Sequence, residues 1–275
     1  MKIYSKHQRE LDLSQPQVMG ILNVTPDSFS DSGKFLALDN ALYHAEQMIQ
    51  QGASIIDIGG ESTRPMADEV TVEQELARVV PVVEALRQRF DCWISVDTSK
   101  AMVMREAAKV GMDLINDIRA LSEEGALTAA VELDLPVCLM HMQGQPRTMQ
   151  QNPVYQDVVS EVLDWLLQRA AVCEQAGIRR ENVILDVGFG FGKTLEHNYL
   201  LLNQLERFVA TDYPILIGLS RKSMIGNVLN KPVDQRMIGS VAGALIAVMK
   251  GAQIVRVHDV AATVDALKIW QATVN

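Results

Sequence analysis

The sequence has few cysteines and no motif that would pair them. Its 275 residues include three, Cys92, Cys138 and Cys173, which are widely spaced in apolar stretches and form no CxxC. An odd number of scattered cysteines argues against a disulfide framework. We therefore expect reduced core cysteines in a cytoplasmic protein.

Long apolar runs and an excess of basic charge are also missing. No run of eighteen apolar residues occurs, and the start, MKIYSKHQRE, contains no apolar stretch of the kind found in secretion signals. The net charge is −9 and the isoelectric point is about 5.1. We expect no membrane and no nucleic-acid partner, whereas a small-molecule partner in a local basic pocket is compatible with this charge.

Linkers and low-complexity segments are absent as well. Apolar residues make up 48% of the chain, which is enough to bury one large core. We therefore expect residues 1–275 to form a single domain.

A repeated pattern fills most of the chain. Short apolar runs end abruptly at a polar residue, and each is followed by a loop and a helical pattern. The runs end at Asn23, Asp57, Asp97, Asn116, His141, Asp186, Ser220 and Arg256. These ends are about 33 residues apart, close to the length of one βαβ unit, and continuous hydrophobicity is typical of parallel strands covered by helices.

Eight such units predict an α/β fold, a (β/α)8 barrel with its active site at the carboxyl ends of the strands. Residues 1–17 are expected to form a short hairpin or irregular cap before the first strand. A doubly wound open sheet is the alternative, but no GxGxxG opens a helix after the first strand. The expected strands are 18–22, 54–60, 93–97, 114–118, 137–142, 183–188, 215–220 and 254–258, and the expected helices are 39–51, 72–88, 100–110, 123–132, 157–176, 195–206, 237–249 and a last one to about 273.

Basic residues cluster where two of these strands end. Arg256 and His258 share one face of the last strand, where burial requires an anionic partner. The segment SRKSMIG places Arg221 and Lys222 at the start of a short helix after the seventh strand, the usual phosphate site of such barrels. Arg64 adds another guanidinium. Each could be a solvated surface charge, but their joint placement favours an anion site.

Three carboxylates form the opposite set. Asp57, Asp97 and Asp186 each end an apolar strand, where a carboxylate can cap the next helix, coordinate a metal ion or accept hydrogen bonds from ligand N–H groups. Capping is the simplest alternative. For Asp97 it is weakened because Thr98 and Ser99 stand closer to the expected helix start.

The segment LDVGFGFGK, at 185–193, alternates glycines with aromatic residues. Glycine lets backbone approach a flat ligand, and Phe189 or Phe191 could pack against it, although such segments often only turn the chain. His141 alternates with methionines and is expected to be structural.

Asn116 and Asp117 cannot both point into the barrel, because neighbouring strand residues face opposite sides. We expect Asn116 to point inward because it shares a face with Leu114 and Ile118.

Together these segments resemble the dihydropteroate synthase family, the sulfonamide target of folate biosynthesis, along nearly the whole chain. The motifs are GILNVTPDSFSDSG, DIGGESTRP, SVDTSK, INDI, LMHMQG, LDVGFGFGK, GLSRKSMIG and VRVHDV. The resemblance implies a pterin-binding (β/α)8 barrel, a transferase that joins (7,8-dihydropterin-6-yl)methyl diphosphate to 4-aminobenzoate and releases pyrophosphate. It further implies Mg²⁺ and a homodimer.

The resemblance also implies residue roles. The pterin would be held by Asp97, Asn116, Asp186 and Lys222, with Met140 and Arg256 on its faces. The diphosphate would be bound by Asn23, Arg64, Arg256 and His258, with Mg²⁺ at Asn23 and Asp57 in support. The aminobenzoate site would be shaped by Thr63, Pro65 and Ser220 with Phe29 and Phe191 nearby, and Gly218 would also line the substrate site.

Three residues depart from the family pattern. Val187 stands where proline is common, and Met66 and Ser32 each replace a common glycine. None removes a charged group, so loop geometry and inhibitor affinity are in question rather than the reaction.

Other functions are compatible with parts of this pattern. A pterin-binding methyltransferase acting on a corrinoid protein would use the same carboxylates but would not need Arg64, Arg256 and His258. A Schiff-base aldolase would carry its lysine at a strand end, whereas Lys222 lies in the loop beyond. A non-catalytic pterin-binding paralogue is disfavoured because every candidate charged group is present.

Overall fold

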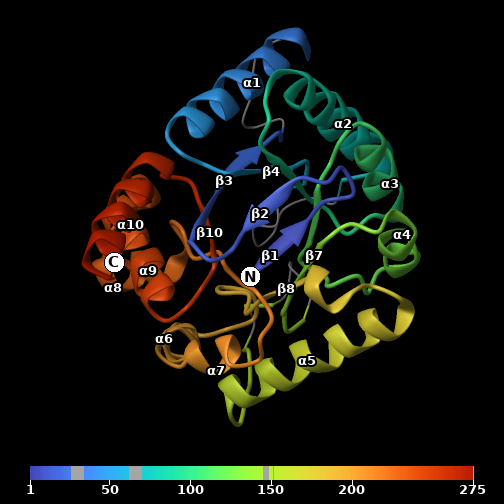
Figure 1. Cartoon of the computed structure of the whole chain (residues 1–275). Helices are drawn as coiled ribbons and strands as arrows, with labels where there is room; N and C mark the ends of the chain where they lie inside the picture. Colours follow the sequence, from blue (N-terminus) through green and yellow to red (C-terminus); the bar gives the residue numbers. More distant parts are fainter. Residues whose placement is uncertain (26–33, 62–69, 145–148, 151, 275) are drawn as a thin grey trace.

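The computed structural model describes residues 1–25, 34–61, 70–144, 149–150 and 152–274. Eight parallel strands close into a barrel in the order β10-β3-β4-β5-β6-β7-β8-β9, and helices form a ring around it (Figure 1). The predicted (β/α)8 barrel is confirmed, and the doubly wound open sheet is wrong. The barrel strands are β3 (Gln17–Asn23), β4 (Ile55–Gly59), β5 (Trp93–Asp97), β6 (Leu114–Asp117), β7 (Val137–Met140), β8 (Val183–Asp186), β9 (Ile215–Ile217) and β10 (Ile254–Val257).

The helices lie close to the predicted ranges. Two predicted helix starts are wrong, since α1 begins five residues earlier and α4 three residues later than expected. The last predicted strand residues have left the ladder after β4, β7 and β9, and the helix predicted at 195–206 divides into α6 and α7. The helices are α1 (Lys34–Gln50), α2 (Val72–Arg89), α3 (Ala101–Lys109), α4 (Ala126–Leu133), α5 (Val158–Ala176), α6 (Leu195–Asn203), α7 (Glu206–Val209), α8 (Ser223–Leu229), α9 (Met237–Met249) and α10 (Val260–Val274), with short 3₁₀ turns at Arg180–Asn182 and Val233–Gln235.

Local sequence signals fix several helix ends. Thr71 begins α2 with a reciprocal capping box to Gln74, and Asp157 begins α5 by accepting the N–H groups of Val159 and Ser160. Gly177 ends α5 at a φ of 115°, a left-handed conformation that suits glycine.

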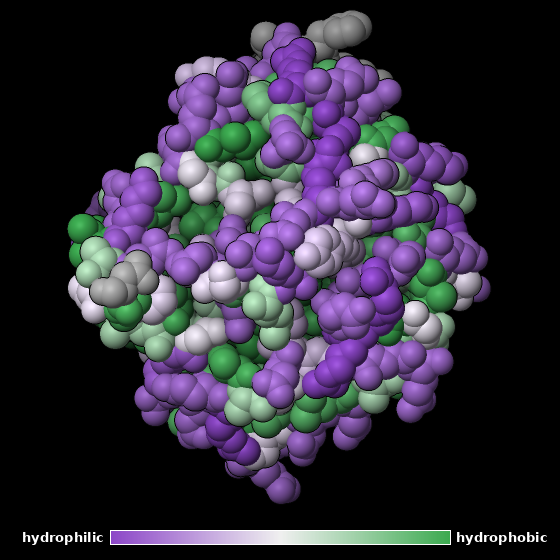
Figure 2. All heavy atoms as spheres, viewed as in Figure 1, coloured by the Kyte–Doolittle hydropathy of each residue, from purple (hydrophilic) through white to green (hydrophobic). Residues whose placement is uncertain are grey.

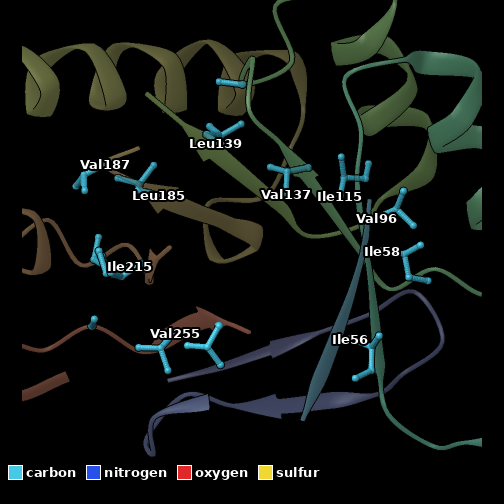
Figure 3. Close-up of a cluster of buried hydrophobic side chains, with 14 of the residues drawn as sticks. Ile56, Ile58, Val96, Ile115, Val137, Leu139, Leu185, Val187, Ile215 and Val255 are labelled. Atoms are coloured by element: carbon cyan, nitrogen blue, oxygen red, sulfur yellow. The ribbon is translucent and has the colours of Figure 1, made fainter. Parts of the chain in front are cut away.

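Strand residues alternate between two apolar layers. Outward side chains pack beneath the helices (Figure 3). This layer includes Ile56, Ile58, Val96, Ile115, Val137, Leu139, Leu185, Val187, Ile215 and Val255. Because both faces of each strand are buried, the runs read as continuously hydrophobic in the sequence.

Inward side chains at the amino-terminal end of the barrel form a second apolar cluster. An antiparallel hairpin of β1 (Lys2–Tyr4) and β2 (Glu10–Asp12) covers this end, as predicted (Figure 1). Its Ile3, Leu11 and Leu13 pack onto Met19, Ile55, Trp93, Leu114, Cys138, Ile184, Leu216 and Ile254. The hairpin therefore closes the barrel floor, and any site must open at the opposite end.

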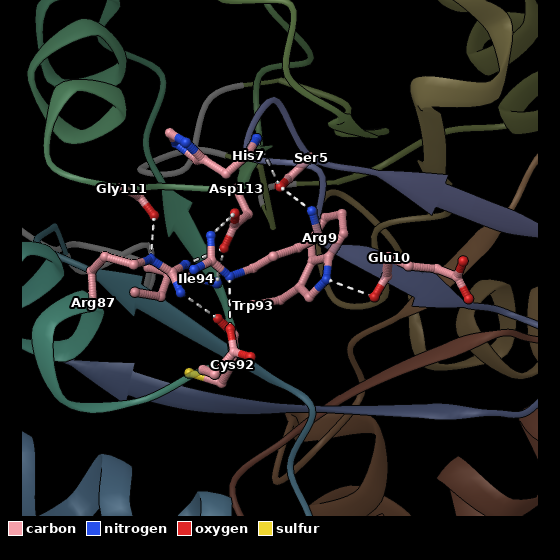
Figure 4. A network of polar contacts seen from close by, with 11 residues as sticks. Ser5, His7, Arg9, Glu10, Arg87, Cys92, Trp93, Ile94, Gly111 and Asp113 are labelled. Carbon is pink, nitrogen blue, oxygen red and sulfur yellow. Dashed lines mark hydrogen bonds and ion pairs between the residues drawn. The ribbon is translucent and has the colours of Figure 1, made fainter.

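A charged network fastens this end of the barrel (Figure 4). Asp113, whose side chain is fully buried, accepts from the guanidinium of Arg87 and from the N–H of Ile94 over 3.0 Å, and Arg9 lies 3.7 Å away. The indole N–H of Trp93 donates to the carbonyl of Glu10 over 3.2 Å, which ties the hairpin to β5. The network lies on the side away from the predicted site and is structural.

All three cysteines are free and buried, as predicted. Within the described residues, no helix combines the length and apolarity that crossing a membrane would require.

Candidate active site

Seven of the predicted site residues, all at the ends of barrel strands, form one layer facing the barrel interior. On most strands the predicted site residue follows, by two positions, a residue of the apolar cluster at the amino-terminal end of the barrel. Residues two apart on a strand face the same side, so both point into the barrel. The pairs are Ile55 and Asp57, Leu114 and Asn116, Cys138 and Met140, Ile184 and Asp186, Leu216 and Gly218, and Ile254 and Arg256; Trp93 precedes Asp97 by four. The layer therefore sits directly above the apolar floor, at the carboxyl ends of the strands.

Arg256 links two carboxylates across this layer. Its Nε donates to Oδ2 of Asp57 over 2.6 Å, and Nη2 donates to Oδ2 of Asp97 over 3.0 Å. Burial lowers the pKa of the guanidinium, but the two carboxylates more than compensate and leave the pKa above its usual value. The arginine is therefore a fixed cation in the absence of any ligand.

Asp57 is the most enclosed member. Its side chain has no exposed surface, and its Oδ2 also accepts from Nδ2 of Asn116 over 3.2 Å. Its Oδ1 is buried without a hydrogen-bond partner among the described residues. Asp57 thus orients Arg256 and Asn116 from below.

Asp97 lies higher, with a side chain about 10% exposed. Burial raises the pKa of its carboxyl to about 7, with Asp57 also raising it and Arg256 opposing the shift. Capping is excluded because Lys100 begins α3 without a side-chain cap, while the hydroxyl of Thr98 accepts the N–H of Lys100. Asp97 is therefore not a helix cap, and its Oδ2 is held by Nη2 of Arg256.

Asn116 points inward, whereas Asp117 points outward. The carboxylate of Asp117 accepts from Ser99 and from the N–H groups of Arg119 and Leu121, which shapes the turn after β6.

Asp186 and Lys222 occupy the opposite side of the barrel mouth. Oδ1 of Asp186 accepts the N–H of Gly188 over 2.8 Å, and burial raises the pKa of the carboxyl while Lys222 lowers it. Nζ of Lys222 donates to the carbonyl of Phe189 over 2.6 Å and lies 4.6 Å from the ring centroid of Phe191. Burial lowers the pKa of Lys222 to about 8. An acceptor and a donor therefore stand together, as a pterin edge would require.

Met140 and Phe191 supply apolar surface beside these groups. Both are buried and pack with Met149 in a small cluster separate from the main core.

His258 and Ser220 form a polar pair at the rim. Nδ1 of His258 lies 3.0 Å from Oγ of Ser220, and the hydroxyl also accepts the backbone N–H of His258 over 3.2 Å. Gly218 lies beside Arg256, since a Cβ there would come 3.8 Å from the Cβ of Arg256. Asn23 ends β3 with an exposed side chain.

One predicted anion-site residue has another role. Arg221 pairs with Asp259 through Nε at 3.0 Å and Nη2 at 2.5 Å, and its backbone adopts a left-handed φ of 57°. The side chain thereby joins the loop after β9 to the start of α10. Placing Arg221 in the phosphate site was therefore wrong, because spacing alone does not show which of two adjacent cations faces inward.

Six residues that the sequence singled out, as predicted site residues or as departures from the family pattern, lie outside the described residues. They are Phe29, Ser32, Thr63, Arg64, Pro65 and Met66. Val187, the third departure, is fully buried in the outer apolar layer. A proline there would face the helices and not the barrel interior.

Sequence reasoning missed Lys193. Its side chain is buried, and Nζ lies 3.0 Å from Nδ1 of His141 and 2.9 Å from the carbonyl oxygen of Gly188. The sequence signal that could have singled out Lys193 is its position directly after the three glycines of segment 188–192. His141 itself is buried, with its ring edge-on to Trp165 at 5.1 Å, and is structural as expected.

The fold and this layer of residues define a pterin-binding barrel, and comparison with known proteins supports that class. Residues 19–258 match the family described as pterin binding enzyme. The dihydropteroate synthases of Haemophilus influenzae and Escherichia coli K12 are 69% and 59% identical over 275 residues, covering all of this chain and 100% and 97% of theirs. The chain belongs to the dihydropteroate synthase family.

Solved structures of dihydropteroate synthases have the same fold as this chain. Yersinia pestis dihydropteroate synthase in complex with a sulfonamide drug superimposes with a TM-score of 0.95 at 58% identity, covering 99% of both chains. The Xanthomonas albilineans enzyme with 4-aminobenzoic acid gives a TM-score of 0.92 at 48% identity, covering 97% of this chain and 96% of that one. The predicted family and the predicted enzyme class, a transferase, are confirmed.

Proposed function

We propose that the protein condenses (7,8-dihydropterin-6-yl)methyl diphosphate with 4-aminobenzoate to give 7,8-dihydropteroate and pyrophosphate, a step of folate biosynthesis. The observation that carries the proposal is the inward layer of Asp97, Asn116, Asp186, Lys222 and Arg256 at one end of the barrel. A planar heterocycle with adjacent N–H donors and ring acceptors is complementary to such a layer.

Asp186 and Lys222 would orient the pterin. The ionised carboxylate accepts from the 2-amino group and N3–H, and the ammonium donates to a ring acceptor. Lys222 bonds the Phe189 carbonyl in this structure. A lysine ammonium has three N–H donors, so it would keep this bond while donating to the pterin. Met140 and Arg256 would pack on the ring faces.

The reaction is a substitution at the methylene carbon. The C–O bond breaks and pyrophosphate leaves with the electron pair, a delocalised cation forms, and the aminobenzoate nitrogen adds and then loses a proton. The arylamine is neutral at pH 7, so no strong general base is needed. Arg256 and His258 would stabilise the leaving group through preorganised hydrogen bonds, with Arg64 assigned to the same role from sequence.

Asn23 is proposed to bind Mg²⁺. Its side chain is exposed at the end of β3, and among the described residues no cluster of three acidic, histidine or cysteine side chains could hold a metal ion. Magnesium commonly takes one or two protein oxygens and completes its shell with phosphates and water, so a single amide oxygen fits this group. When bound, the ion would neutralise charge on the departing diphosphate.

A homodimer is proposed through α8, α9 and α10. Large apolar side chains are exposed on these adjacent helices, and Figure 2 shows apolar residues along this edge of the molecule. They include Val228, Ile238, Ile246, Met249 and Ile269, of which Ile238 is 73% exposed. Such a patch marks an interaction surface, and a second copy is the partner we propose.

Sedimentation velocity tests the dimer. Ile238→Glu should shift the protein to monomer, whereas Val154→Glu, at a residue 64% exposed away from these helices, should leave it dimeric. A monomeric wild type, or a dimer unaffected by Ile238→Glu, would refute this interface.

A cytoplasmic location is also proposed. All three cysteines are free and buried in the core, as expected of a protein folded in a reducing compartment.

Pyrophosphate release on mixing the purified protein with both substrates and Mg²⁺ tests the reaction. Release should require all three components. Release without aminobenzoate, or none with all components present, would contradict the synthase assignment. The pterin-binding methyltransferase is the second candidate; the synthase is favoured because the relatives named above are synthases.

A further inference from the structure

The loop between β8 and α6, residues 188–193, is held by side chains along its whole length. Each carbonyl from Gly188 to Gly192 accepts a hydrogen bond from a side chain. The donors are Lys193 to the carbonyls of Gly188 and Phe191, Lys222 to Phe189, Gln150 to Gly190 and Tyr155 to Gly192. A loop with so many fixed carbonyls has one well-defined shape.

The glycines make this shape possible. Gly188, Gly190 and Gly192 have φ values of 67°, 79° and 62°, in the left-handed region. A Cβ at Gly188 would come 1.9 Å from the carbonyl oxygen of His141. The loop therefore packs directly on the end of β7.

Lys193 is the central donor of the loop. Its side chain is 3% exposed, and Nζ reaches four acceptors: Nδ1 of His141 at 3.0 Å, the carbonyl of His141 at 3.3 Å, that of Gly188 at 2.9 Å and that of Phe191 at 3.0 Å. No carboxylate pairs with it among the described residues. Burial lowers the pKa of this amine to about 7, with Asp186 opposing the shift and Lys222 adding to it. A lysine buried among neutral acceptors therefore carries a desolvation cost.

His141 is suited to this contact. Burial, together with Lys193, lowers the pKa of its imidazole to about 2, so the ring is neutral and Nδ1 can accept. Lys193 thus joins the end of β7 to both ends of the loop.

The hydrogen bonds of Lys193 hold the part of the loop that contacts Asp186 and Lys222, the two residues proposed to orient the pterin. The N–H of Gly188 holds Oδ1 of Asp186, and the carbonyl of Phe189 holds Nζ of Lys222. Lys193 bonds the Gly188 carbonyl on one side of these contacts and the Phe191 carbonyl on the other. Its charge also favours the ionised form of Asp186 by lowering the pKa of that carboxyl.

We propose that Lys193 is a positioning residue for the pterin site: its buried Nζ holds the 188–192 loop against His141 so that Asp186 and Lys222 meet the pterin edge in register. The residue does not touch the ligand. This inference rests on the proposed function and deepens it.

Lys193→Met tests the proposal, because methionine fills similar space without charge or donors. The KM for the pterin diphosphate should rise by about tenfold to a hundredfold, the range expected from a misplacement of about 1 Å. The KM for aminobenzoate should change by less than about threefold, since Thr63, Pro65 and Ser220 of its predicted pocket belong to other loops and only Phe191 lies in this one. Lys193→Arg, which keeps the charge and donors, should recover part of the loss.

Tyr155→Phe is the matched control, because Tyr155 lies just before α5 and donates to the same loop. It removes only the donor to the Gly192 carbonyl, which has no link to Asp186 or Lys222. It should leave the pterin KM close to that of the wild type. A folded Lys193→Met variant with a lower melting temperature but unchanged KM for both substrates would show a purely structural lysine and overturn the proposal.

Two further measurements keep the outcomes separate. If Lys193→Met does not fold, His141→Gln decides, because it alters the loop's anchor while retaining the lysine; an unchanged pterin KM would overturn the proposal.

Calorimetry with 6-hydroxymethylpterin measures binding without turnover. A wild type that binds this pterin but makes no dihydropteroate would refute the proposed reaction, and the effect of Lys193→Met on binding would still test the positioning role.

Discussion

Arg256 donates from Nε to Oδ2 of Asp57 over 2.6 Å, although 199 positions separate the two residues in the chain. The contact crosses from the last barrel strand to the second, so it forms only when the barrel closes. It pre-orders the cation that is proposed to receive the leaving group, and preorganised charge is the larger part of many rate enhancements.

Replacing Asp186 with asparagine should weaken pterin binding more than aminobenzoate binding. Asparagine presents donors to the ligand's own donors and removes a charge-assisted bond, which should cost on the order of 2 to 4 kcal/mol. Calorimetry with a pterin ligand measures this, and Asp164→Asn on the exposed side of α5 is the control. An unchanged affinity would remove Asp186 from the site.

Arg256→Ala and His258→Ala should be non-additive for pyrophosphate binding. Two groups that share one ligand are coupled, typically by about 0.5 to 3 kcal/mol. The pyrophosphate affinity of both single variants and of the double variant gives the coupling energy. Strict additivity would mean that the two side chains do not share the anion.

Asp97→Asn should change the pH dependence of stability. Burial raises the pKa of Asp97 from 3.8 to about 7, so the folded state retains a proton that the unfolded state releases. The stability from this group is fully present below about pH 3.8 and is lost as the pH rises through about 7.

Denaturant unfolding from pH 4 to pH 8 measures this effect. The wild type should lose on the order of 2 to 4 kcal/mol of unfolding free energy relative to Asp97→Asn across the range. Parallel curves for the two proteins would show that Asp97 does not titrate there.

Arg87→Met should destabilise the protein without altering the chemistry. It leaves the fully buried Asp113 without its closest cation, a change that typically costs about 3 to 5 kcal/mol. Arg105→Met breaks an exposed pair with Glu132 and should cost less than about 1 kcal/mol. The contrast is measured by denaturant unfolding, with kcat unchanged in both variants because Asp113 lies on the side of the barrel away from the site. Equal losses of stability would show that burial of Asp113 is not the cause.

The sequence predicted the barrel because hydrophobic periodicity is a local property. Continuous runs such as Ile55 to Ile58 require burial on both faces, and eight of them with helical spacers leave few arrangements. Because neighbouring strand residues face opposite sides of the sheet, the sequence could also predict that Asn116 and not Asp117 points into the barrel.

The motifs also predicted which polar residues come together, since inward residues at strand ends converge in any parallel barrel. The spacing of charged residues in the sequence could not show which ion-pair or hydrogen-bond partner each side chain has. Arg221 and Lys222 are adjacent cations in one loop, yet the first pairs with Asp259 and the second faces the site.

The sequence by itself therefore determined the fold, the family and the layer of polar residues above the apolar floor, because these follow from pattern and register. Only the tertiary structure decided that Arg256 bridges Asp57 and Asp97, and that Lys193 is buried against His141 beneath the glycine loop. The physical reason is that pairing energies and pKa values depend on distance and desolvation between residues far apart in the chain, which periodicity does not encode.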